Sequence, residues 1–76
     1  MLKELLTQNL KATILDLSNK NISNTSELRD LENLKELQEL DLQGNTLVDL
    51  PDDLSKLQKL KILNVMDNPF NNVYMI

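Results

Sequence analysis

The sequence predicts an α/β fold in which a short strand recurs at a nearly regular interval and the copies stack into a solenoid with a parallel three-strand sheet. The main observation is an apolar phrase that occurs three times, as ATILDLSNKNI from Ala12, LQELDLQGNTL from Leu37 and LKILNVMDNPF from Leu60. Successive copies begin 25 and 23 residues apart, and a period in the twenties is typical of repeat proteins. Eighteen of the 76 residues are leucine, so leucine supplies most of the candidate core.

The phrase follows the template L-x-x-L-x-L-x-x-N-x-L, and on these residues the chain resembles the leucine-rich-repeat family. The resemblance covers residues 12–70, which divide into units 12–36, 37–59 and a partial unit 60–70. It implies a right-handed leucine-rich-repeat solenoid with strands on the concave side and helical turns on the convex side. The 23-residue second unit has the length of the common intracellular type.

The first segment, residues 1–11, is predicted to be a helix that caps the open end of the solenoid. Leu2, Leu5, Leu6 and Leu10 recur at the spacing of one helix face, and polar residues fill the other face. Terminal units of repeat proteins need such a polar outer surface, and this helix would provide it.

Each phrase opens with alternating residues, which predicts strands over 13–17, 38–42 and 61–65. In each strand two apolar residues point inward: Leu15 and Leu17, Leu40 and Leu42, Leu63 and Val65.

The segments between the strands are predicted to return the chain along the convex side as helical turns. Asn24 and Glu27 have the spacing of a capping box before the first of these segments. In the second, Pro51 suits the start of a short helix because its missing N–H is not needed there.

Asn45 and Asn68 take the asparagine position of the template in the second and third phrases. The family resemblance implies that they form a ladder, each side chain bonding backbone groups of neighbouring units. The first phrase has Lys20 there, which predicts that the first unit departs from the pattern.

The outward strand positions are the candidate partner-binding residues. They are Ile14, Asp16, Glu39, Asp41, Ile62, Asn64 and Met66. Asp16 and Asp41 should stand on adjacent strands, where mutual repulsion raises a carboxyl pKa. The patch could dock a basic or hydrogen-bond-donating partner, or simply keep the sheet face in water. Its carboxylates could also form a metal site or a catalytic acid pair, but the interleaved ligands of a calcium loop and a nucleophile or histidine are missing. Exposed isoleucine and methionine among the carboxylates favour a surface that a partner covers.

Composition narrows the function classes. There is no cysteine and no histidine, which argues against disulfides, thiolate or imidazole metal sites and Cys or His catalysis, so no enzyme, metal site or cofactor is predicted. A net charge of −4 with interspersed signs argues against nucleic acid, and no apolar run has the length of a membrane span. The expected location is intracellular: cytoplasmic, with a nuclear one as the alternative.

The predicted function is a protein–protein interaction module that binds through the concave face. One alternative is a structural subunit of a larger assembly, held through open solenoid ends; another is the targeting part of a regulatory enzyme complex. Residues 71–76 form an apolar tail, which favours a partner or self-association at the C-terminal edge.

Overall fold

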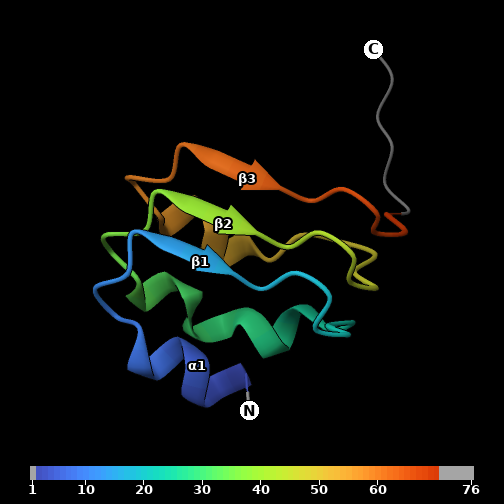
Figure 1. The fold of residues 1–76 in the computed structure, drawn as a ribbon, viewed down its shortest axis with the longest axis horizontal. Coiled ribbons are helices and arrows are strands. Elements are labelled where there is room, and N and C mark those ends of the chain that lie inside the picture. The colour runs from blue at the N-terminus through green and yellow to red at the C-terminus, as the bar shows by residue number, and fades with distance from the viewer. Residues whose placement is uncertain (1, 71–76) are drawn as a thin grey trace.

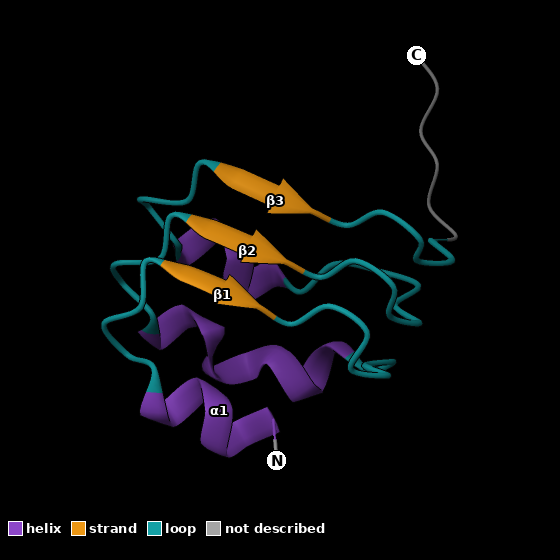
Figure 2. Ribbon diagram, viewed as in Figure 1, coloured by secondary structure: helices purple, strands orange, loops and turns teal. Residues whose placement is uncertain are grey.

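The computed structural model describes residues 2–70, with the side chains of Leu2, Lys3 and Asp53 left out of the description. Three strands alternate with helices along the chain. The order is α1 (Leu2–Gln8), β1 (Ile14–Asp16), η1 (Thr25–Asn33), β2 (Glu39–Asp41), η2 (Asp52–Lys56) and β3 (Ile62–Asn64), where η marks a 3₁₀ helix. The strands lie side by side and point the same way, and the helices lie on one side of the sheet (Figures 1 and 2).

The sheet is parallel with the order β1-β2-β3, as predicted. The register also agrees with the sequence alignment, because Leu15 pairs with Leu40, and Leu40 pairs with Leu63. The strands are three residues long, shorter than the predicted five. Inter-unit hydrogen bonding nevertheless continues beyond them: the Leu17 N–H donates to the Asp41 carbonyl at 2.8 Å, and the Leu42 N–H donates to that of Asn64 at 2.7 Å.

The core is a leucine cluster between the sheet and the helices. The inward residues of the first two strands are buried, and Leu28 and Leu31 of η1 are buried against them. The inward residues of the third unit, Leu63 and Val65, are only half-buried. Burial therefore decreases from the second unit to the third.

The N-terminal helix is shorter than the predicted 1–11 segment. Leu6 is fully buried and Leu5 packs partly against the core, but Leu10 is exposed in the turn that follows, so its predicted place on the apolar face is wrong. The reason is local. The Asn9 side chain donates to the Leu5 carbonyl at 2.6 Å, and the Ala12 N–H then closes a turn onto the Asn9 carbonyl at 3.0 Å. Helix α1 lies beside η1 (Figure 1).

The predicted capping box at Asn24 is confirmed. The Asn24 side chain accepts from the Ser26 N–H at 2.9 Å, and the Glu27 carboxylate accepts from the Ser23 and Asn24 N–H groups. These bonds satisfy backbone donors that the start of a helix leaves without partners. In the second unit the buried Pro51 directly precedes η2, which begins without a side-chain cap.

Three positions after the end of each strand, a residue has left-handed backbone geometry. Asn19, Gly44 and Asp67 occupy the same position of the phrase and have φ values of 53°, 71° and 58°. Glycine, asparagine and aspartate tolerate this region best. At Gly44 the space is also limited, because an added Cβ would clash with the Asn19 side chain of the preceding unit.

The Asn45 side chain joins the first two units. It is 3% exposed, and its Oδ1 accepts from the Lys20 and Ile22 N–H groups, both at 3.0 Å. Its Nδ2 donates to the Leu17 and Leu42 carbonyls, both at 2.9 Å. A single buried amide therefore satisfies two donors and two acceptors around the turn.

Asn68 repeats this arrangement between the second and third units in a more exposed setting. Its Oδ1 accepts from the Leu47 N–H at 3.0 Å, and its Nδ2 donates to the Leu42 carbonyl at 2.8 Å. Lys20, at the equivalent place in the first unit, is exposed, and the following Asn21 has a φ of 58°. The first unit thus departs from the pattern, as the sequence predicts.

Replacing Asn45 with alanine should lower the free energy of unfolding by about 2 kcal/mol or more, because it removes the partners of several buried backbone groups. The matched change Asn68→Ala should cost less, since its surroundings are half-exposed. Urea unfolding followed by circular dichroism measures both. Equal losses for the two variants would contradict the role given to burial.

Candidate functional site on the outer face of the sheet

The side of the sheet opposite the leucine core, here called the outer face, carries two rows of side chains. The parallel register aligns Ile14, Glu39 and Ile62 in the first row and Asp16, Asp41 and Asn64 in the second row. Side chains alternate between the two sides of a strand, so these residues flank the inward leucines. The structure therefore brings together six of the seven residues that the sequence predicts for partner binding.

A shallow hollow of about 300 Å³ lies along these rows, with Leu15 and Leu40 also among its lining residues. Ile14 and Ile62 border it and are 65% and 54% exposed. Met66, the seventh predicted residue, is 66% exposed but does not line the hollow. Exposed isoleucines on both sides of a glutamate form a mixed apolar and acidic surface.

The second row has a structural role that the sequence reasoning missed. In each unit the side-chain Oδ1 of this row accepts the N–H of the residue two positions later. The bonds join Asp16 to Ser18 and Asp41 to Gln43, both at 2.9 Å, and Asn64 to Met66 at 3.1 Å. Aspartate and asparagine are the residues that form such turns, so their recurrence at this position was a usable signal.

The pKa of Asp16 is lowered, which corrects the expectation that repulsion within the patch raises it. The main cause is the Ser18 hydroxyl, which donates to Asp16 Oδ1 at 2.5 Å, followed by the Ser18 N–H. Lys20 contributes a weaker electrostatic effect in the same direction. Hydrogen bonds to the charged form thus outweigh the partial loss of hydration, which acts to raise this pKa, and Asp16 stays ionised at neutral pH.

The outer-face carboxylates have no cationic partner among the side chains that the structure describes. No lysine or arginine nitrogen of the described residues lies within 4.0 Å of the Asp16, Glu39 or Asp41 carboxylate. Within the described part of the chain, the Glu39 carboxylate also accepts no hydrogen bond from a side chain or a backbone N–H. Glu39 lies between two isoleucines in the first row.

On the helical side, in contrast, carboxylates of the first unit pair with lysines of the second. Glu32 lies 2.7 Å from the Lys56 ammonium group, and Glu36 lies 2.8 Å from that of Lys59. The hydrogen bond from Lys56 is the main cause of a lowered Glu32 pKa. These pairs are exposed, so they align neighbouring units more than they stabilise them.

Gln43 is a further outer-face residue that the sequence reasoning did not single out. Its side-chain oxygen accepts from Asn64 Nδ2 at 2.9 Å, and its amide nitrogen donates to Asp67 Oδ2 at 3.2 Å. Both polar atoms of Asn64 are therefore engaged within the chain. Asn64 is for this reason a weaker candidate for partner contact than Glu39.

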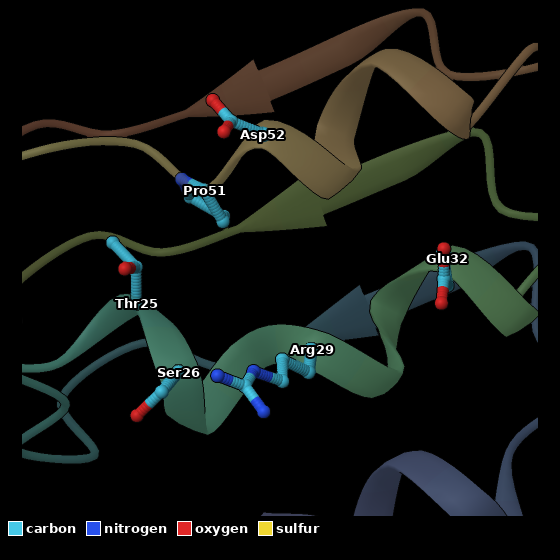
Figure 3. Close-up of a pocket in the computed structure, with 6 residues that line it drawn as sticks. All are labelled: Thr25, Ser26, Arg29, Glu32, Pro51 and Asp52. Atoms are coloured by element: carbon cyan, nitrogen blue, oxygen red, sulfur yellow. The ribbon is translucent and has the colours of Figure 1, made fainter.

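A second groove, of about 290 Å³, lies between η1 and η2 on the helical side (Figure 3). Its labelled side chains are Thr25, Ser26, Arg29, Glu32, Pro51 and Asp52. The Thr25 and Ser26 hydroxyls share this groove with the Glu32 and Asp52 carboxylates, and the Glu32 carboxylate is engaged by Lys56.

Among the acidic side chains that the structure describes, no set of three or more lies close enough together to hold a metal ion. In the described part of the chain, no helix has both the length and the apolar character required to cross a bilayer.

Comparison with known proteins agrees with the repeat pattern. Residues 36–57 match the family model described as Leucine Rich Repeat. The matched segment contains β2 and Asn45, and it continues through most of the second unit to Leu57. No curated protein matches the chain.

The turn role of Asp41 predicts that charge and hydrogen bonding are separable at this position. Asp41→Asn keeps the acceptor for the Gln43 N–H and should leave the free energy of unfolding nearly unchanged. Asp41→Ala removes the acceptor and should lower it by about 1 kcal/mol. Urea unfolding of both variants checks this, and equal values for the two would rule out the turn as the main role.

Acidification should lower stability through Asp16 and Glu32. Both have a lowered pKa in the folded state, so their contribution is complete above the ordinary carboxyl range of about 4 and is lost as the pH falls through the lowered values. We expect the urea midpoint to fall between pH 5 and pH 3, and to fall less in Glu32→Gln. A midpoint that rises on acidification would contradict this assignment.

Proposed function

We propose, because residues 36–57 match the leucine-rich-repeat family model and the repeat pattern extends on both sides of them, that this chain is a protein–protein interaction module that binds through its outer face. Repeats of this family generally serve as protein-binding surfaces. In this proposal the outer face is the concave side of a short solenoid, and α1 caps its N-terminal end through the buried Leu6.

One observation carries the proposal: the first row places two exposed isoleucines on either side of a carboxylate that lacks a cation. Ile14 and Ile62 expose more than half of their surface beside the hollow. Contiguous apolar surface with polar residues around it is typical of interaction sites. Protein interfaces likewise have an apolar centre and a polar rim. The first row supplies the centre, and Asp16, Asp41 and Asn64 supply part of the rim.

The two rows contribute differently to binding in this proposal. One oxygen of Asp16 and one of Asp41 already accept turn hydrogen bonds, so each carboxylate has its second oxygen left for a partner. Glu39 has both oxygens left. Met66 extends the apolar part of the surface beyond the hollow.

A second candidate function, a structural unit held through its C-terminal edge, is favoured by the third unit. Leu63, Val65 and Phe70 are half-buried, whereas their equivalents in the second unit, Leu40, Leu42 and Leu47, are almost fully buried. An apolar surface at the edge of a parallel sheet suits pairing with further structure, including a second copy. Sedimentation of the 76-residue chain separates the two functions, because a stable monomer counts against self-association.

The outer-face proposal predicts that Ile62→Glu abolishes partner capture and leaves the fold intact. Val48→Glu is the matched control, since it introduces the same charge at an exposed apolar residue outside the outer face. Proteins retained from an extract by the unchanged chain should be retained by Val48→Glu and lost with Ile62→Glu, while the circular dichroism spectra remain alike. Equal retention by the two variants would exclude the outer face.

A further inference from the structure

We propose that the segment bound on the outer face carries a lysine or arginine whose cationic group meets Glu39 while its aliphatic stem packs on Ile14 and Ile62. This inference rests on the proposed function, because it assigns a chemistry to the partner of that same face. It commits to a basic protein segment, and not to an acidic or wholly apolar one.

The outer face carries carboxylates that no cation of the described residues complements. Asp16, Glu39 and Asp41 stand on two adjacent strands, and no cation that the structure describes lies within 4.0 Å of any of them. Adjacent parallel strands are about 4.8 Å apart, so carboxylates on neighbouring strands repel one another. Along the chain, the nearest lysine to Asp16 is Lys20 and the nearest to Glu39 and Asp41 is Lys35, and neither forms an ion pair with these carboxylates.

The helical side differs from the outer face because its carboxylates form ion pairs. There Glu32 and Glu36, which are also exposed carboxylates of the first unit, are each matched by a lysine of the second unit. The same stacking of units therefore supplies cations on one surface and omits them on the other. An incoming basic side chain provides on the outer face what Lys56 and Lys59 provide on the helical side.

The first row has a shape that suits a basic side chain. Glu39 pairs with Ile14 on one side and with Ile62 on the other, which places its carboxylate between two exposed apolar side chains. Lysine and arginine have long apolar stems that pack on such surfaces and a charged head that remains with a polar partner. The row thus matches both parts of a basic side chain.

The carboxylates of the outer face disfavour apolar and acidic partners. A wholly apolar segment would remove the outer-face carboxylates from water without a compensating charge, which is strongly unfavourable. An acidic segment would add repulsion. Asp16 and Asp41 are also held in position by their turn hydrogen bonds, so they do not rotate away freely. The lowered pKa of Asp16 keeps that carboxylate ionised at neutral pH.

The test is selection of short random peptides, displayed on phage, against the immobilised 76-residue chain. Selected peptides should be enriched in lysine or arginine next to apolar residues. Titration of one such peptide should show that replacing its basic residue with methionine weakens binding about tenfold or more. Glu39→Gln should weaken binding by a similar factor, and higher salt should weaken it further. Glu36→Gln, the same change on the helical side, is the control and should leave the affinity unchanged.

The outcomes separate this inference from the proposed function. Peptides without basic residues that still lose binding in Ile62→Glu overturn the basic-segment inference and leave the outer face as the binding site. Peptides that bind Ile62→Glu as well as the unchanged chain overturn both proposals. The same holds if the selection yields no peptide that binds in titration.

Discussion

The buried amide of Asn45 is the interaction on which the rest of the structure depends. Each unit turns sharply after its strand, and the turn leaves backbone N–H and C=O groups facing the interior without regular partners. Asn45 satisfies groups of the first unit and of its own unit at once, and Asn68 does the same one unit later. Because these bonds join successive units, they hold the strands in register. The row Ile14–Glu39–Ile62 exists only in that register.

The same turn explains why the outer face carries acidic side chains. Each strand is three residues long, and its last residue has a short side chain that accepts the N–H two positions later. This hydrogen bond forms the turn that ends the strand. A residue with left-handed backbone follows, which Asn19, Gly44 and Asp67 tolerate. Asp16 and Asp41 therefore have structural reasons to be present, and their charge is available to a partner as a consequence. Glu39 makes no such bond, so no turn requirement accounts for it.

Sequence periodicity predicted the register and the core because both follow from the positions of leucines alone. It also identified Asn24 and Glu27 as a capping box, since that motif is local. It failed where a neighbouring side chain decides the outcome. Leu10 leaves the apolar face because Asn9 closes the helix, and the Asp16 pKa is lowered because Ser18 supplies a hydroxyl as well as an N–H. The half-burial of the third unit depends on tertiary packing, which a repeated phrase does not encode.

The proposed binding at the outer face would be coupled to folding. In a repeat protein each unit is stabilised mainly by its neighbours, so the third unit, with a half-buried Leu63 and Val65, is the least supported of the three. A partner that lies along the first row contacts β1, β2 and β3 together. It therefore stabilises the third unit whenever it binds, because a ligand that binds only the folded form shifts the equilibrium toward it. In the proposed binding mode, the isoleucines of the row supply affinity through apolar burial, whereas Glu39 chiefly selects which segment is accepted, since charge complementarity contributes more to specificity than to affinity.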